Sequence, residues 1–138
     1  MKKTLLLEQA QESIKYNKEE WYRCAISRGY YYLFHHAVEV TGGITPKYGP
    51  KGETLTGGMH KKLYSYFLLS GEKDENEVNE YKDFLSLLGQ CLKLQHSRRV
   101  DADYKLELPT PKAKAITSIE EVKLMVKKIE ENISGSKT

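Results

Sequence analysis

The residues with the clearest potential for chemistry are an arginine, a tyrosine and a histidine on one predicted helix. Arg28, Tyr32 and His35 lie within residues 18–41, and spacings of four and three residues place them on one helical face. Arginine neutralises phosphate charge, and histidine exchanges protons near neutral pH. Two turns separate Arg28 from His35, about 10 Å along the axis at 1.5 Å per residue. They can therefore meet only through long side chains or a bridging ligand.

A second polar segment, RRVDADY at residues 98–104, closes the helix predicted for residues 75–98. Basic residues at the carboxyl end of a helix complement the helix dipole. Carboxylates and a tyrosine then follow the arginines, so the segment offers ionic and hydrogen-bonding groups together. The residues that we single out here are Arg99, Asp103 and Tyr104.

Two interpretations of Arg28 follow from these segments. In the first, Arg28 forms an internal ion pair with Asp103 or Asp101 when the two helices pack, because a buried arginine needs a carboxylate. In the second, the segments form a polar cleft that accepts a phosphate or a nucleotide. The cleft residues would then be Arg28, His35, Arg99, Asp103 and Tyr104.

Several other kinds of site are excluded by their missing motifs. There is no Gly-rich phosphate loop, no HExxH and no CxxC, which removes the usual nucleotide-loop and zinc signatures. His35 and His36 are adjacent, so on a helix they diverge by about 100°. We expect no metal and no cofactor. Cys24 and Cys91 are predicted to be buried free thiols, and His60 a surface histidine.

The elements that must position these residues are helices. Residues 18–41 contain no proline and only one glycine, Gly29. Apolar residues cover most of the circumference of this predicted helix, which is typical of a central, buried helix. They form two stripes, Tyr22, Ile26, Leu33 and Ala37 on one, and Trp21, Ala25 and Tyr32 on the other.

Helical periodicity also predicts segments at residues 4–16, 59–69 and 75–98, and a fifth helix capped by Thr117 or Ser118. In the fourth segment, Val78 and Tyr81 begin the apolar stripe. Residues 42–58 are rich in glycine and proline and are expected to form a long loop, and residues 134–138 a frayed tail. The prediction is an all-α, up-and-down bundle of four to five helices in one domain, residues 1–138.

Composition limits the class of protein. The 138 residues are 39% hydrophobic and 30% charged, with a net charge of +3, as expected of a globular domain. This charge does not by itself imply nucleic-acid binding. The apolar run at the amino terminus stops at Glu8, which is too short for a signal peptide. No run approaches the roughly 18 apolar residues of a membrane span, so we expect a cytoplasmic protein without membrane contact.

The two polar segments together resemble the HEPN family of small helical-bundle proteins. One segment matches S-R-x-Y-Y-x-x-F-H-A on the second helix, and the other matches R-x-x-A-D-Y at the end of the long helix that follows. The resemblance covers about residues 4–133. The matching residues are Ser27, Arg28, Tyr30, Tyr31, Phe34, His35 and Ala37, then Arg99, Ala102, Asp103 and Tyr104.

This resemblance implies a helical bundle that often forms a homodimer. Catalytic members of the family are metal-independent ribonucleases with an R-x4-6-H motif duplicated across the dimer. Many are toxins that pair with a minimal nucleotidyltransferase antitoxin. The resemblance therefore implies a role with RNA or a nucleotide, of a toxin–antitoxin or defence type.

The chain departs from the catalytic motif. Counted from Arg99 or Arg98, the histidine place holds Tyr104 or Asp103, and neither titrates as histidine does near neutral pH. We therefore predict weak RNA cleavage or none, with His35 as the first candidate should cleavage occur. The alternative is a non-catalytic scaffold that binds a nucleotide or a nucleotidyltransferase. Arg23, which lies outside both motifs, is predicted to matter far less than Arg99.

Overall fold

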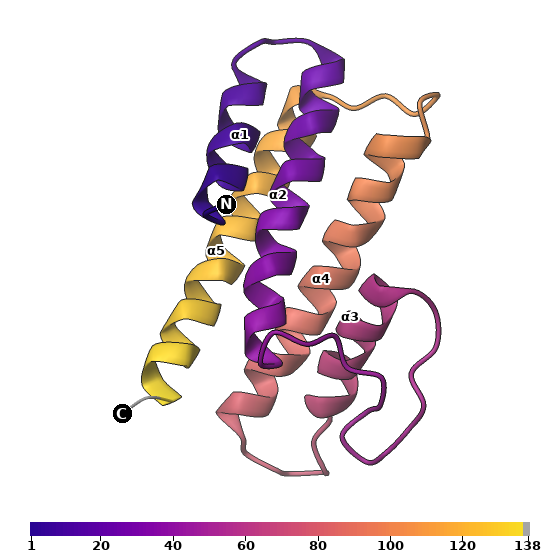
Figure 1. Cartoon of the computed structure of the whole chain (residues 1–138), viewed down its shortest axis with the longest axis vertical. Coiled ribbons are helices and arrows are strands. Elements are labelled where there is room, and N and C mark those ends of the chain that lie inside the picture. The colour runs from indigo at the N-terminus through magenta and orange to yellow at the C-terminus, as the bar shows by residue number, and fades with distance from the viewer. Residues whose placement is uncertain (137–138) are drawn as a thin grey trace.

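The computed structural model describes residues 1–136, which form five helices and no strand. Four helices run alternately up and down the bundle (Figure 1): α1 (Thr4–Ile14), α2 (Glu19–Val40), α4 (Glu80–Tyr104) and α5 (Lys112–Ser136). The shorter helix α3 (Met59–Ser70) packs beside α4. This arrangement confirms the predicted all-α bundle. Within the described residues, no helix is both long enough and apolar enough to cross a membrane.

Helix α2 lies at the centre of the bundle, in contact with α1, α4 and α5. Its predicted stripes are largely buried, and Leu33 and Ala37 are fully inaccessible. Burying a leucine side chain such as that of Leu33 contributes roughly 1.5–3 kcal/mol to the stability of the fold. Trp21 is the exception, because 39% of its surface stays exposed in the first turn of α2. The central position of α2 places some of its polar residues, Arg23 and Ser27 among them, in contact with α4.

Helix α4 begins and ends later than its apolar stripe predicts. The side chain of Asn79 accepts a hydrogen bond from the Lys82 amide at 3.0 Å and so caps the helix. Val78, predicted to lie on the apolar stripe, is 93% exposed before the helix, and Tyr81 is also exposed. At the other end, the segment 98–104 forms the last turns of α4. Its polar residues are therefore held on a rigid helix.

Helix α5 begins at Lys112, several residues before the predicted cap. The Pro111 carbonyl accepts the first helical hydrogen bond, from the Lys114 amide at 3.1 Å. Ser118 is buried inside the helix, where its hydroxyl accepts from Arg98 at 3.3 Å. The prediction missed this start because residues 112–115 carry good helix formers but no side-chain cap. The helix extends through Ser136, into the segment predicted as a tail, and residues 137–138 lie outside the described part.

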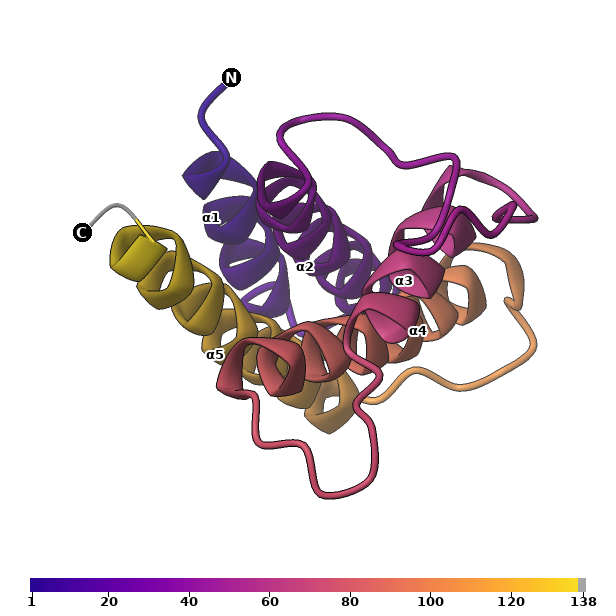
Figure 2. The ribbon, with the colours of Figure 1, turned by 90° about the horizontal axis from the view of Figure 1, so that it is seen from below.

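The segment 42–58 is irregular, as predicted, but it is tied to itself and to the bundle. Tyr48 and Thr54 form an isolated antiparallel bridge, and Leu55 is 7% exposed. Figure 2 shows the segment leaving α2 and crossing to the far side of α3 before entering that helix. It therefore positions the first turn of α3, which carries His60.

Candidate functional site around Arg99

The two polar segments of the sequence meet where α2 packs against α4. The Ser27 hydroxyl on α2 donates to Asp103 Oδ2 on α4 at 3.3 Å. One turn away, the Arg99 guanidinium carbon lies 5.2 Å from the centre of the Tyr31 ring, a cation–π contact. Because these contacts link motif residues some seventy positions apart, packing brings the two segments into one site.

The Arg99 side chain is only 15% exposed, and its hydrogen-bonding capacity is unused. Its Nε atom lies 3.0 Å from Asp103 Oδ2, but the geometry is not that of a hydrogen bond, and buried Nε has no acceptor. Within residues 1–136, no protein group accepts from its terminal nitrogens. Asp103 thus balances the charge of Arg99 while leaving its donors free, an arrangement suited to an anion.

Two histidines from different helices flank this arginine. His96 precedes Arg99 by three residues on α4, so the two share a face. His60, from the first turn of α3, stacks on His96 with ring centroids 5.1 Å apart and planes inclined by 23°. We call the group Arg99, Asp103, His96, His60, Tyr30 and Tyr31 the Arg99 cluster.

A buried tyrosine fixes the protonation of His60. Tyr30 is 2% exposed, and its hydroxyl lies 2.6 Å from His60 Nδ1. Burial, together with the neighbouring Tyr31, raises the pKa of Tyr30 far above its usual range, so the phenol keeps its proton. Among residues 1–136 the buried hydroxyl has no other acceptor, so we assign it as the donor to Nδ1, which places the proton of the neutral His60 ring on Nε2.

Both histidines of the cluster are held in the neutral form. Burial lowers the pKa of His60, and the positive charges of His96 and Arg99 lower it further. Burial also lowers the pKa of His96, with Arg99 as the second cause. The charged imidazolium is disfavoured when it is desolvated beside a cation. At neutral pH the cluster therefore offers one fixed cation and two neutral imidazoles.

The structure does not bring Arg28 and His35 into this cluster. Arg28 is exposed and lines a hollow between α1 and α2. The predicted ion pair of Arg28 with Asp103 or Asp101 is wrong, because Asp103 pairs with Arg99 and Asp101 pairs with Lys105 at 3.0 Å. His35 is also exposed, and among residues 1–136 its ring contact is with Phe34 alone. Both side chains point outward because α2 buries its other faces.

The prediction of a surface histidine at position 60 is also wrong, since His60 is half-buried between Tyr30, Phe34 and His96. The spacing of His96 and Arg99 was visible in the sequence and could have identified that pair. His60 carried no such signal, because only the long segment 42–58 and the packing of α3 on α4 bring it there.

Tyr104, the remaining predicted residue, closes the cluster from the end of α4. Its ring centre lies 5.7 Å from the Arg99 guanidinium carbon, and 69% of its surface is exposed. Arg99 therefore contacts two tyrosine rings, the half-buried Tyr31 on α2 and the exposed Tyr104 on α4. The exposed ring leaves room for a ligand to approach.

Arg23 has a structural role that its sequence context hid. Its side chain is 11% exposed and pairs with Glu19 at 2.8 Å. The guanidinium also donates to the Ala102 carbonyl at 2.9 Å and to the carbonyls of Asp101, Lys105, Leu106 and Leu108. These carbonyls lie at the end of α4 and beyond it, where helical partners are missing. Arg23 is therefore not the exposed side chain that its sequence context indicated, and its predicted rank below Arg99 stays a prediction.

The two thiols lie in different environments, and neither is fully buried. Cys24 is exposed, contrary to the prediction, and Cys91 is half-buried. Burial raises the pKa of Cys91 to about 11, so this thiol stays protonated and unreactive at neutral pH.

Among the described residues, no group of three or more His, Cys, Asp or Glu side chains could hold a metal ion. The Arg99 cluster itself contributes a cation, two imidazoles and tyrosine hydroxyls. No protein-family model, no curated protein and no solved structure matches this chain.

Proposed function

We propose that this protein is a HEPN-like helical module that binds RNA or a nucleotide, and that the Arg99 cluster holds the phosphate. The observation that carries the proposal is the unused donor capacity of a mostly buried arginine. A desolvated guanidinium whose donors lack protein acceptors is a strong partner for phosphate oxygens. The resemblance of both polar segments to HEPN proteins favours RNA or a nucleotide as the source of that phosphate.

Each side chain of the cluster has a distinct role in this proposal. Arg99 contacts the phosphate through its free terminal nitrogens, and Asp103 orients Arg99. His60 donates from Nε2, because its Nδ1 is occupied by Tyr30. His96 has no hydrogen-bond partner among the described residues, so its neutral ring can accept a proton. The exposed ring of Tyr104 provides a surface on which a base can stack.

These roles permit slow RNA cleavage. In such a reaction the 2′-hydroxyl loses its proton to His96, its oxygen attacks phosphorus, and the bond to the 5′-oxygen breaks to leave a cyclic phosphate. The leaving 5′-oxygen takes its proton from water, because a histidine with a lowered pKa is rarely charged at neutral pH. His96 can therefore act as a base, but the site lacks a charged histidine that could act as an acid. This agrees with the departure from the family motif, in which Tyr104 stands at the histidine position.

Basic residues next to His60 in the sequence add support for a polyanionic ligand. Lys61 and Lys62 follow His60 in the first turn of α3, and Lys61 is exposed. Lys51, in the segment before α3, instead lines a hollow at the other end of that helix, with Leu69 and Ser70. Contacts between lysine and phosphate give binding that weakens as salt rises. We include in the proposal a homodimer, a minimal nucleotidyltransferase partner and a toxin–antitoxin or defence role, all of which rest on the resemblance.

Phosphate binding is tested with a fluorescent RNA oligonucleotide in EDTA, measured by anisotropy at several salt concentrations. Arg99→Gln is expected to weaken binding about tenfold or more, since a charged hydrogen-bonding group is lost. His35→Ala, an exposed residue of the other segment, should bind as the wild type does. Circular dichroism confirms that each variant is folded. Equal affinity for a folded Arg99→Gln variant would overturn the proposal.

Cleavage is tested by incubating the same RNA without metal and measuring cyclic-phosphate ends. We expect slow cleavage that is lost in His96→Ala and persists in His35→Ala. His60→Gln tests the donor role, because it keeps a donor but cannot titrate. Cleavage that survives His96→Ala and disappears in Tyr104→Phe would assign the chemistry to the tyrosine instead.

A non-catalytic scaffold is the second candidate function, and the exposure of Tyr104 favours it. With 69% of its surface accessible beside Arg99, this tyrosine can contact a partner protein or a nucleotide without any proton transfer. Binding that depends on Arg99, with no cyclic phosphate formed over a full day, would favour the scaffold over the ribonuclease.

A further inference from the structure

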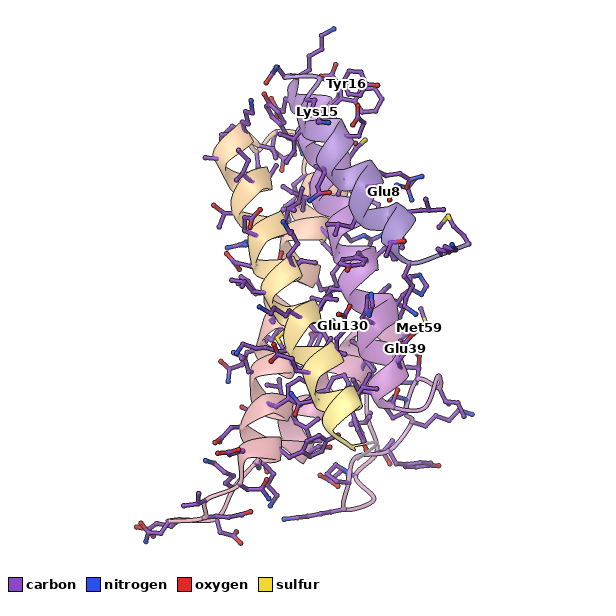
Figure 3. All side chains as sticks on the ribbon, turned by 90° about the vertical axis from the view of Figure 1, so that its left-hand side faces the viewer. Glu8, Lys15, Tyr16, Glu39, Met59 and Glu130 are labelled. Carbon is purple, nitrogen blue, oxygen red and sulfur yellow. The ribbon has the colours of Figure 1, made fainter. Side chains whose placement is uncertain are left out.

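A second polar and aromatic hollow lies between α1 and α2, apart from the Arg99 cluster. Its volume is about 310 Å³, near the lower limit of small-molecule sites. The end of α1 and the first turns of α2 line it. Tyr16 lies at the end of the bundle where α1 leads into α2 (Figure 3). Aromatic rings stand at one end of the hollow and an arginine at the other.

The aromatic end consists of Tyr16 and Trp21. Their ring centroids are 4.7 Å apart, with planes inclined by 31°. Although they contact each other, Tyr16 remains 56% exposed and Trp21 39% exposed. Leaving two large rings in water forgoes their burial energy. A planar ligand that stacks on them would recover it, at about 1–3 kcal/mol per base.

The arginine end is Arg28, which has no hydrogen-bond or ion-pair partner among the described residues. Arg28 lies two turns beyond Trp21 on α2, and helical side chains lean toward the amino terminus. Arg28 and the two rings line the same hollow, so one ligand can reach both. A ligand with a planar ring at one end and an anionic group at the other fits this pair.

The wall between the two ends comes from α1, and it is polar. Gln9 and Glu12 line it, and both side chains can accept hydrogen bonds. Lys15 pairs with Glu12 at 3.1 Å, so the carboxylate does not face an incoming anion as an unbalanced charge. Acceptors beside a stacking surface favour a base that carries an exocyclic amino group.

We infer that this hollow binds a nucleoside monophosphate unit whose base carries an amino group. The base stacks on Trp21 and Tyr16, its amino group donates to Gln9 or Glu12, and its phosphate contacts Arg28. The unit can be a free nucleotide or the end of an RNA chain. This site shares no residue with the Arg99 cluster, so this inference can be tested independently of the function proposed there.

The only tryptophan of the chain provides the measurement. Quenching of Trp21 fluorescence is followed on titration with AMP, UMP, inorganic phosphate and a short oligoadenylate. AMP should bind about tenfold more tightly than UMP, because uracil lacks the amino group. Phosphate alone should leave the fluorescence unchanged. Tighter binding of the oligoadenylate than of AMP would identify an RNA end as the ligand, and the reverse would identify a free nucleotide.

Variants separate this site from others. Arg28→Ala should weaken AMP binding about tenfold, whereas Lys127→Ala, an exposed cation on α5, should not. Arg99→Gln should also leave the Trp21 signal unchanged. Alkylation of Cys24, which lines the same hollow, should slow when AMP is present. The inference is overturned if AMP does not quench Trp21, if AMP and UMP bind equally, or if Arg99→Gln abolishes the signal while Arg28→Ala does not.

Discussion

Arg23 and Arg28 lie five residues apart on α2 and have very different contacts. Arg23 is nearly buried and satisfies carbonyls at the end of α4, together with the Glu19 carboxylate. Glu19 in turn accepts from the Thr110 amide at 3.2 Å, so the pair also holds the connection between α4 and α5. Arg28 contacts none of these groups. Identity of residue type therefore says little about energetic importance.

Arg23→Ala is expected to lower the free energy of unfolding by about 2–3 kcal/mol, since hydrogen bonds from a charged group are lost and carbonyls are left without partners. Arg28→Ala, on the same helix, should change it by less than about 0.5 kcal/mol. Urea denaturation monitored by circular dichroism measures both. Equal midpoints for the two variants would show that the carbonyl contacts of Arg23 are energetically unimportant.

Acid should destabilise the protein through its partly buried histidines. The pKa values of His36, His60 and His96 are all lowered in the folded state, mainly by burial. The unfolded chain therefore binds more protons than the folded one as pH falls below about 6.5, the unperturbed histidine pKa. Their contribution is fully present above pH 6.5 and is lost as pH falls through the lowered values.

The measurement is urea denaturation at pH 7.5 and pH 5.0. Wild type should lose stability across this interval, and a His60→Gln/His96→Gln double variant should lose less of it. Acidic groups also titrate in this interval. The quantity to compare is therefore the change in the free energy of unfolding per pH unit, the slope, in the wild type and in the double variant. NMR titration of the histidine rings should give pKa values below 6.5 for His60 and His96. A double variant with the wild-type slope would contradict this origin.

At the scale of elements, the packing of α3 against α4 depends on close backbone approach. A Cβ atom built on Gly89 of α4 would lie 2.9 Å from the Leu68 amide nitrogen on α3, which is too close for van der Waals contact. The same atom on Gly29 of α2 would lie 3.6 Å from Ile119 Cγ1, an ordinary contact. Both glycines are buried inside helices, so they form a matched pair.

Gly89→Ala should therefore destabilise the protein by about 1–3 kcal/mol, as overpacking does, and should separate α3 from α4. Gly29→Ala should stabilise it by about 0.5–1 kcal/mol, because alanine is the better helix former. Thermal denaturation gives the sign of each change. Since α3 carries His60, Gly89→Ala should also weaken the RNA binding proposed for the Arg99 cluster. A stabilised Gly89→Ala variant would show that α3 can shift without cost.

At the scale of the whole molecule, an apolar groove of about 350 Å³ between α4 and α5 suits the proposed homodimer. Leu87, Leu94 and Leu124 line it and are 42%, 45% and 63% exposed. Glu121, also in the lining, is paired with Arg98 at 3.1 Å within the chain. A two-fold axis through the groove would bury the exposed leucines of the two copies against each other.

We predict that Leu94→Glu or Leu124→Glu converts a dimer into a monomer, because a charge would be placed in the apolar contact. Ile116→Glu changes an equally exposed residue of α5 outside the groove and should leave the dimer intact. Light scattering at micromolar concentration reports the mass. A wild-type monomer at that concentration would remove the dimer from the proposed function.

The helices could be predicted from the sequence, and so could the positions of the two polar segments. Apolar periodicity is a local property, so it located all five helices, although caps and packing shifted their ends. The residue types of the segments at 27–37 and 98–104 likewise pointed to anion chemistry before any contact was known.

Which residues come together in one site depends on how the helices pack. A helix has a continuous circumference, and the packing of its neighbours determines which residues on it are covered. Because α1, α4 and α5 surround α2, Arg28 and His35 were left facing outward, while Tyr30 and Tyr31 met α3 and α4. His60 reached the cluster through a long irregular segment, and Arg23 found the end of α4 about eighty residues away. Such distant contacts leave no local periodic trace in a sequence, and they set the free energy and the protonation of the site.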